Sequence, residues 1–260
     1  MEKKKDLLIG IYWWRFLSIT SIINIIYVTN YYFTTNLPPN KLYLLSCVTI
    51  YTYVCAIRAI FPRKDIDSIC FYNSIISYPL IGRILATIAE ISLIVAVSNI
   101  FKELSFKINN NTNVSFYNLL IILIVIAQIF CWSGCITKCN LFNTIEESIW
   151  AFTAFIILIS NISLYNNTNN LEFKKLLMNS IIFSAIYIIY MIYIDIPGYY
   201  SKWKNKRKYY SVADGLISMY SCKKSQLYTI WKSDMLWLTG YFTMCVWGSI
   251  FLVKWYENNL

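Results

Sequence analysis

The stretch NLLIILIVIAQIFCWSGCIT, residues 118–137, contains no charged side chain. A helix needs about 20 consecutive apolar residues to cross the hydrocarbon core of a bilayer, and this stretch has that length. The rest of the chain has a similar character. Of its 260 residues, 58% are hydrophobic and only 14% are charged, whereas roughly 25% of a soluble domain is charged. The sequence therefore predicts an integral membrane protein.

Similar apolar stretches lie on both sides of this one. The predicted spans are 8–32, 42–60, 79–100, 118–137, 145–164, 177–195 and 235–254. No linker or change of composition divides them. We therefore predict an all-α, polytopic transmembrane helical bundle of about seven spans, which forms a single integral membrane domain over residues 1–260.

The basic residues predict an orientation. Lys and Arg are concentrated in the segments on the side of the N-terminus, which include the connection 196–234. Cytoplasmic segments of membrane proteins carry such an excess, so the N-terminus is predicted to be cytoplasmic. The heavy use of lysine in the overall composition accounts for part of the net charge of +10, which by itself implies no nucleic-acid partner. The sequence does not identify which membrane holds the protein.

Two full charges, Arg83 and Glu90, interrupt the third span within GRILATIAE, residues 82–90. Residues seven apart on a helix share one face, about 10.5 Å apart along the axis. Small residues share this face, namely Gly82, Ala86 and Ala89, and the opposite face holds Ile84, Ile88, Ile91 and Val95. A charge at the centre of a membrane helix costs about 2.5–3.5 kcal/mol on insertion scales. We therefore expect the charged face to point into the bundle.

Other charged residues are expected at a similar depth. We predict a cluster that opens toward the cytoplasm, formed by Arg15, Arg58, Arg83, Glu90, Glu146, Glu147 and Asp195. Two interpretations stay open. The cluster could hold interhelical ion pairs that fix the packing, or it could line a cavity for an ion, a small solute or a lipid headgroup. In the second case the protein is a transporter or channel, with Arg83 as counter-charge to Glu90 on the pathway.

A basic cluster follows the sixth span, in KWKNKRK. Its members that could grip anionic headgroups of the inner leaflet are Lys202, Trp203, Lys204, Lys206, Arg207 and Lys208. Each basic residue near the surface contributes about 1 kcal/mol to such binding. The other interpretation is a signal that orients the chain. Lipid binding would favour an alternative function, an inner-leaflet lipid enzyme or binding protein in which Arg58 and Arg83 hold phosphate while Glu146, Glu147 or Asp195 transfer protons. A non-catalytic assembly factor is a third hypothesis.

Cofactor and metal chemistry are not expected. The chain has eight cysteines and no histidine, and CWSGCITKC, residues 131–139, lacks the spacing of a metal site. Most cysteines lie in spans or on the predicted cytoplasmic side, so no disulfide framework is expected either. No catalytic motif is present, and an enzyme is not expected, although that question stays open. Whether the chain forms a homo-oligomer also stays open.

Local sequence features predict an aromatic belt near the N-terminus and a turn after the sixth span. Trp13 and Trp14 are interpreted as part of an aromatic belt at headgroup level. DIPGYYSKW, residues 195–203, is expected to end the sixth span with a turn at Pro197 and Gly198.

Four motifs in order along the chain resemble a family of uncharacterised multi-pass membrane proteins of bacteria, algae and other protists. They are RAIFPRKDIDSIC (58–70, with FPRxD), GRILATIAE (82–90, with GRxxATxAE), IEESIW (145–150, with EES) and DIPGYYSKW (195–203, with DxPxYxxxW). The resemblance implies a shared fold and assigns no activity.

Overall fold

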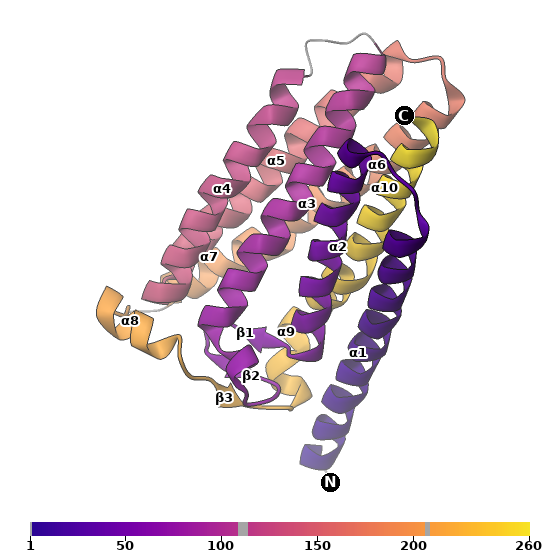
Figure 1. Ribbon diagram of the computed structural model, residues 1–260. Helices are drawn as coiled ribbons and strands as arrows, with labels where there is room; N and C mark the ends of the chain where they lie inside the picture. Colours follow the sequence, from indigo (N-terminus) through magenta and orange to yellow (C-terminus); the bar gives the residue numbers. More distant parts are fainter. Residues whose placement is uncertain (1, 109–113, 206–208) are drawn as a thin grey trace. The chain divides into compact units, whose positions relative to one another are not determined.

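Helices make up most of the protein in the computed structural model, which describes residues 2–108, 114–205 and 209–260 (Figure 1). The first elements are α1 (Glu2–Thr34), α2 (Pro39–Ile60), β1 (Arg63–Lys64), β2 (Ile69–Cys70), a 3₁₀ turn η1 (Ile75–Ser77), α3 (Pro79–Lys107), α4 (Val114–Thr137) and α5 (Asn140–Asn167). The later elements are α6 (Leu171–Tyr190), a π-helical turn η3 (Met191–Asp195), α7 (Ile196–Asn205), α8 (Val212–Ser218), β3 (Lys223–Lys224), α9 (Tyr228–Gly240), a second π-helical turn η4 (Tyr241–Cys245) and α10 (Val246–Asn259).

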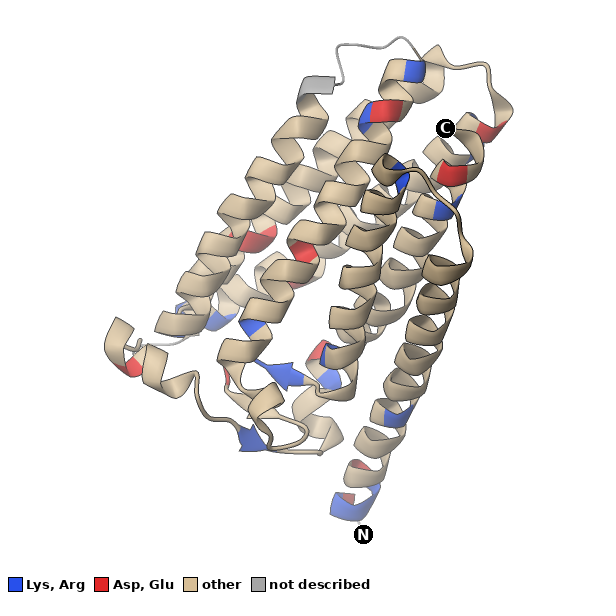
Figure 2. Ribbon diagram, viewed as in Figure 1, with Lys and Arg blue, Asp and Glu red and all other residues tan. Residues whose placement is uncertain are grey.

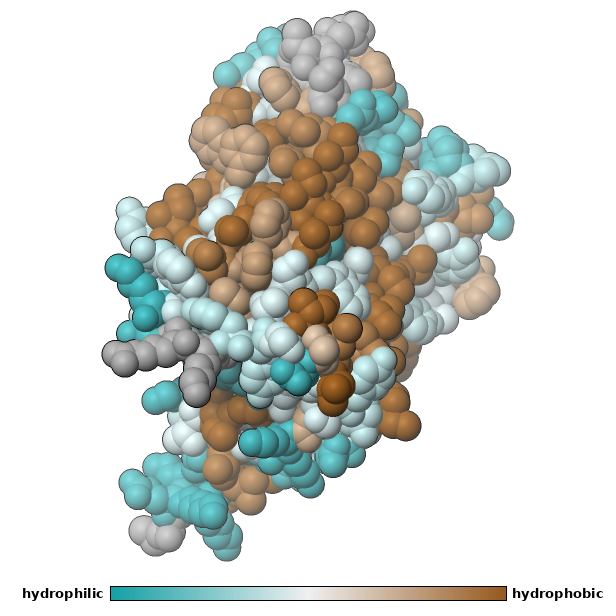
Figure 3. Space-filling view, turned by 90° about the vertical axis from the view of Figure 1, so that its left-hand side faces the viewer, coloured by the Kyte–Doolittle hydropathy of each residue, from teal (hydrophilic) through white to brown (hydrophobic). Residues whose placement is uncertain are grey.

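Within the described residues, seven helical stretches are long and apolar enough to cross a membrane. They are Glu2–Thr34, Pro39–Ile60, Pro79–Lys107, Phe116–Thr137, Asn140–Asn167, Leu171–Asn205 and Tyr228–Asn259. Each contains one of the seven predicted spans. The helices have long stretches without charge (Figure 2), and apolar side chains predominate over much of the face shown in Figure 3. The protein is an integral multi-pass membrane protein with an all-α helical fold.

The chain forms two compact units. The first unit comprises Met1–Ala96 and Ala213–Trp255, and the second comprises Val97–Val212 and Tyr256–Leu260. The single domain and the cytoplasmic N-terminus stay predictions.

The first unit is held together by polar contacts between α1 and the last helical stretch. Asp6 accepts hydrogen bonds from the backbone N–H and the hydroxyl of Thr229, at 3.0 and 2.9 Å. Because the first N–H groups of a helix lack partners within it, this carboxylate caps α9. Farther along α1, the Asn24 amide donates to the carbonyl of Phe242. At Gly10 an added Cβ would lie 2.2 Å from the carbonyl oxygen of Gln226, so only glycine permits this approach.

The two adjacent tryptophans of α1 point into the first unit. The indole of Trp13 donates to Thr239, and the indole of Trp14 donates to the carbonyl of Ile60 at 2.9 Å. The Trp14 ring also stacks on Phe71, with the ring centroids 5.7 Å apart. The protein itself therefore satisfies the N–H groups of both rings, and their place in a belt at headgroup level stays a prediction.

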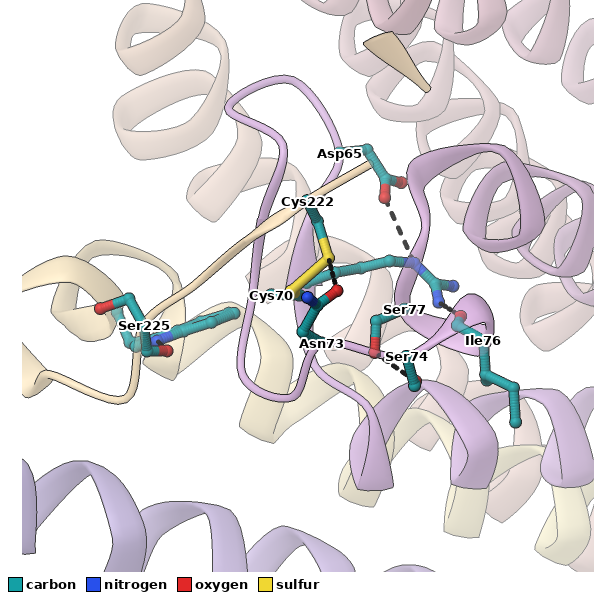
Figure 4. The surroundings of a disulfide bond; sticks show 10 residues. Asp65, Cys70, Asn73, Ser74, Ile76, Ser77, Cys222 and Ser225 are labelled. Carbon is teal, nitrogen blue, oxygen red and sulfur yellow. Dashed lines mark hydrogen bonds and ion pairs between the residues drawn. A yellow bond between two sulfur atoms is a disulfide. The ribbon is translucent and has the colours of Figure 1, made fainter. Parts of the chain in front are cut away.

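The segments that join the helices of the first unit form a small sheet in the order β1-β2-β3. Strands β1 and β2 are antiparallel, with Arg63 opposite Cys70, and β2 and β3 are parallel. A disulfide joins Cys70 to Cys222, 152 residues farther along the chain (Figure 4). The expectation that these two cysteines form no disulfide is wrong. Residues distant in sequence meet here through strand pairing, which the hydropathy pattern does not encode.

In the second unit, α5 packs against α4, α6 and α7. Buried polar groups join these helices. The hydroxyl of Tyr117 donates to the Asn161 side-chain oxygen at 2.9 Å, and the Asn161 amide donates to Ser180 at 2.8 Å. Interhelical hydrogen bonds of this kind stabilise helix packing in membranes.

The chain does not turn at Pro197 and Gly198. It stays helical from α6 through η3 and α7 to Asn205, so the predicted turn is wrong, and 196–205 is helix rather than loop. Proline lacks an N–H group and clashes with the carbonyl one turn earlier. The π-helical turn η3, which ends at Asp195 two residues before Pro197, changes the local hydrogen-bonding register, and such bulges relieve these conflicts without ending a helix.

Candidate functional site

The charged face of α3 is buried, as predicted. Arg83 and Glu90 are 7% and 8% exposed, and Ala86 and Ala89 are fully buried. On the opposite face, Ile84 is 42% exposed. The first turns of α3 therefore place their charges inside the first unit and turn branched apolar side chains outward.

Ion pairs extend from Glu90 to the β1–β2 hairpin. The guanidinium of Arg83 lies between two carboxylates, with Nη2 3.6 Å from Oε1 of Glu90 and Nε 3.9 Å from Oδ2 of Asp65. Asp65 in turn pairs with Arg63, whose Nε lies 3.2 Å from Oδ1. The second end of the Arg63 guanidinium donates to the carbonyl of Ile76 at 2.9 Å (Figure 4). Positive and negative groups thus alternate from the loop into the helical bundle.

Gly82 makes room for this arrangement. A Cβ added at Gly82 would lie 1.8 Å from Nε of Arg63, so the guanidinium rests directly on the backbone of α3. Neither partner of Arg63 in this position is on α3, since Asp65 and Ile76 both belong to the preceding connection. Gly82 therefore determines where the Arg63 guanidinium can lie.

Arg58, on the last turn of α2, adds a third guanidinium. It interacts electrostatically with Arg83, Glu90 and Asp65. Its guanidinium carbon lies 5.7 Å from the ring centroids of both Tyr241 and Phe242. We call the set of Arg58, Arg63, Asp65, Arg83 and Glu90 the guanidinium cluster.

Two groups near Glu90 are buried donors that have no hydrogen-bond partner among the described residues. They are Nη1 of Arg58 and the hydroxyl group of Tyr241. The ring of Tyr241 meets that of Tyr51 edge to face, with centroids 5.9 Å apart. Tyr241 begins the π-helical turn η4, and such turns are frequent at functional sites. Because nearly all buried polar groups are paired in folded proteins, this group of donors favours a site that receives an acceptor.

The guanidinium cluster carries an excess of positive charge. Its three arginines face two carboxylates, which leaves one positive charge uncompensated within the set. Burial lowers the pKa of Arg63 to about 10; Asp65 opposes the shift, and the neighbouring Arg58 and Arg83 add to it. Arg63 is still charged at neutral pH. Buried cations without full compensation are costly, so an anion bound here would be stabilising.

The other predicted cluster residues are Arg15, in the first unit, and Glu146, Glu147 and Asp195, in the second. Arg15 is exposed, with its guanidinium carbon 6.0 Å from the ring centroid of Tyr12 on the same helix. Glu146 is buried in the second unit and accepts a hydrogen bond from Asn143 at 3.1 Å. Glu147 and Asp195 also belong to the second unit. Their common pathway with Arg58, Arg83 and Glu90 stays a prediction.

Sequence reasoning missed Arg63 and Asp65 as members of the site. Both lie in a polar connection, where no helical periodicity marks buried residues. Gly82 could have indicated that another chain segment comes close at this point, because glycine allows a close approach to the helix backbone.

The predicted lipid contact lies partly outside the described residues, because Lys206, Arg207 and Lys208 are not among them. Lys202 and Lys204 of α7 are exposed. The ammonium of Lys202 lies 5.2 Å from the ring centroid of Tyr199, and that of Lys204 lies 5.1 Å from the ring centroid of Tyr200. Trp203 packs beside the Tyr200 ring. Lysines and aromatic rings therefore share the end of this helical stretch.

Among the described residues, no group of three or more Cys, Asp or Glu side chains is placed to hold a metal ion. No family model matches the chain, and no curated protein and no solved structure matches it. The resemblance to the uncharacterised multi-pass family stays a prediction.

Proposed function

We propose that this membrane protein binds a small anion at the guanidinium cluster and conducts or transports it. The observation that carries the proposal is the combination of a positive charge excess with two buried donors that lack a partner among the described residues, Nη1 of Arg58 and the hydroxyl of Tyr241. A proton or a metal cation would be repelled by such a set. An anion would accept the donors' hydrogen bonds and neutralise the excess charge.

Glu90 has a defined part in this function. It pairs with Arg83 and so keeps that guanidinium from binding the anion too tightly. A conduction or transport site must bind its ion strongly enough to admit it and weakly enough to release it. Glu90 is thus the counter-charge that sets affinity, and the three arginines supply the attraction.

The test is anion binding by the full chain in nanodiscs of neutral lipid. Chloride, nitrate, sulfate and phosphate are titrated separately by calorimetry, and efflux of any anion that binds is measured from vesicles. Arg58→Gln should weaken binding at least about tenfold, since a charge-assisted hydrogen bond contributes about 1.5–3 kcal/mol. Arg15→Gln is the matched control, because Arg15 is exposed on the neighbouring α1. Absence of binding by all four anions, or equal effects of the two variants, would reject the proposal.

Tyr241→Phe gives a sharper test that does not depend on a disrupted fold. It keeps the ring against Arg58 and removes a hydroxyl that has no partner among the described residues. Such a variant should be at least as stable as the parent protein. Weaker anion binding together with unchanged or higher stability supports a role in binding; unchanged binding removes Tyr241 from the site.

A second proposal concerns α7. Lys202, Trp203 and Lys204 contact anionic headgroups, with the tyrosine rings orienting the ammonium groups. This contact would anchor the helix end at the membrane surface and is independent of anion transport.

A further inference from the structure

The disulfide between Cys70 and Cys222 lies directly beside the proposed anion site. Cys70 pairs with Arg63 across the β1–β2 ladder. Strand β3 is held on β2 by two backbone hydrogen bonds of 2.8 Å, from Lys223 to Ser68 and from Ser225 to Cys70. The covalent bond therefore fixes the third strand against the one that positions Arg63 (Figure 4).

The chemical surroundings favour a reducible bond. Cys70 is fully buried, whereas Cys222 is partly exposed and is followed by the exposed Lys223 and Lys224. The positive charge of these two lysines attracts anionic thiols such as glutathione. An attacking thiolate can thus reach the sulfur of Cys222.

The predicted orientation places this sheet on the cytoplasmic side, since the loops that hold it share the side of the N-terminus. Disulfides are rare in a reducing cytoplasm, and those that occur there are usually catalytic or redox-sensing. We propose that Cys70–Cys222 is a reversible redox lock that holds the guanidinium cluster in its anion-binding arrangement. This inference rests on the proposed function and on the predicted orientation.

The reaction needs an external thiol reductant, such as two glutathione molecules or one dithiol. Its thiolate attacks Sγ of Cys222; the Cys70–Cys222 bond breaks and Cys70 leaves as a thiolate, which takes up a proton. A second thiol attacks the mixed disulfide, releases Cys222 as a thiol and leaves the reductant oxidised. Two electrons and two protons pass to the protein in total.

Reduction would leave β3 held on β2 by two backbone hydrogen bonds alone. The β1–β2 hairpin that carries Arg63 would then be less rigid, and with it the contacts of the guanidinium with Asp65 and Ile76 over Gly82. When only a fraction of the molecules has the site in its ordered form, the apparent affinity for the anion is reduced to that fraction of its full value. Anion binding is therefore expected to weaken on reduction and to recover on reoxidation.

The test uses the full chain in nanodiscs, equilibrated with glutathione buffers and quenched by alkylation to count thiols. The disulfide should open at glutathione ratios typical of a reducing cytoplasm. Anion binding should fall roughly tenfold in the reduced protein, the scale expected when preorganisation is lost, and return after reoxidation. The double variant Cys70→Ser with Cys222→Ser should bind the anion as weakly as the reduced protein, and its affinity should not depend on the glutathione ratio.

Each outcome is decisive. A disulfide that stays closed in these buffers overturns the lock and identifies a structural bond. Unchanged anion binding on reduction overturns the lock and leaves the proposed function intact. If no anion binds in either state, the proposed function fails. Hydrogen exchange at the amides of Lys223 and Ser225 then tests the lock alone: faster exchange on reduction supports it, and unchanged exchange overturns it.

Discussion

The two units solve the problem of buried polar groups in different ways. In the second unit, Tyr117, Asn161 and Ser180 form a chain of neutral hydrogen bonds in which the hydroxyl and the amide each donate to a neighbouring oxygen. In the first unit, the guanidinium cluster pairs three arginines with two carboxylates and leaves donors of Arg58 and Tyr241 without a partner among the described residues.

We propose that this difference separates structural from functional polarity. A closed chain of neutral hydrogen bonds stabilises helix packing and needs nothing from outside. A charged set with excess donors is incomplete in itself and favours a bound acceptor. Substitutions in the two regions should therefore have different effects on anion affinity and stability.

Glu90→Gln should have the largest effect. It removes one partner of Arg83 and leaves a buried cation less compensated, which should lower the free energy of unfolding by about 3–5 kcal/mol. Anion affinity should rise at the same time, because the positive excess grows. Unfolding in mixed micelles and calorimetric titration measure the two effects. The control is Glu103→Gln, on the same helix but in the second unit, which should leave anion affinity unchanged.

Gly82→Ala comes next. The new methyl group would occupy the place of the Arg63 guanidinium, so the unfolding free energy should fall by about 1–3 kcal/mol, as in other overpacked sites. Adding Arg63→Ala should recover part of the loss, because the clash disappears. Gly248→Ala is the control, since a Cβ at Gly248 meets no atom within 4 Å. Additive effects of Gly82→Ala and Arg63→Ala would contradict the close approach.

Asn161→Leu tests the second unit. It removes two hydrogen bonds and should cost about 1–2 kcal/mol of stability, the upper range measured for polar contacts between membrane helices. Anion affinity should not change. A change in affinity as large as that caused by Arg58→Gln would remove the distinction between the two regions.

Lys202→Gln combined with Lys204→Gln should have the smallest effect. Each lysine near the membrane surface contributes about 1 kcal/mol to the attraction of anionic lipid. Less phosphatidylserine should therefore remain bound during purification, as quantified by mass spectrometry, while stability stays the same. Lys174→Gln is the control, since Lys174 makes a similar contact with Tyr165 near the other end of the α6–α7 stretch. Equal lipid loss in control and variant would contradict a specific contact.

The sequence predicted the spans well because hydropathy over about 20 residues is a property of each helix alone. It also predicted the buried face of α3, since Arg83 and Glu90 share a helical stripe whose other members are small. Local pattern was sufficient in both cases.

Features that depend on segments distant in sequence were missed. Arg63 and Asp65 enter the site through a hairpin, and Cys70 meets Cys222 through the pairing of β2 with β3. The turn expected at Pro197 failed for a local reason: the π-helical turn before it accommodates the proline within a continuous helix.

The cap that Asp6 provides for α9 has a consequence for biosynthesis. The ribosome makes α1 before α9, so Asp6 is made before the helix start that it caps, and the partners of Trp13 and Asn24 belong to the same later stretch. Until that stretch is made, α1 must sit in the bilayer with polar groups unsatisfied. A nascent chain stalled before residue 228 would therefore expose these groups to the chaperones and proteases that survey unfinished membrane proteins.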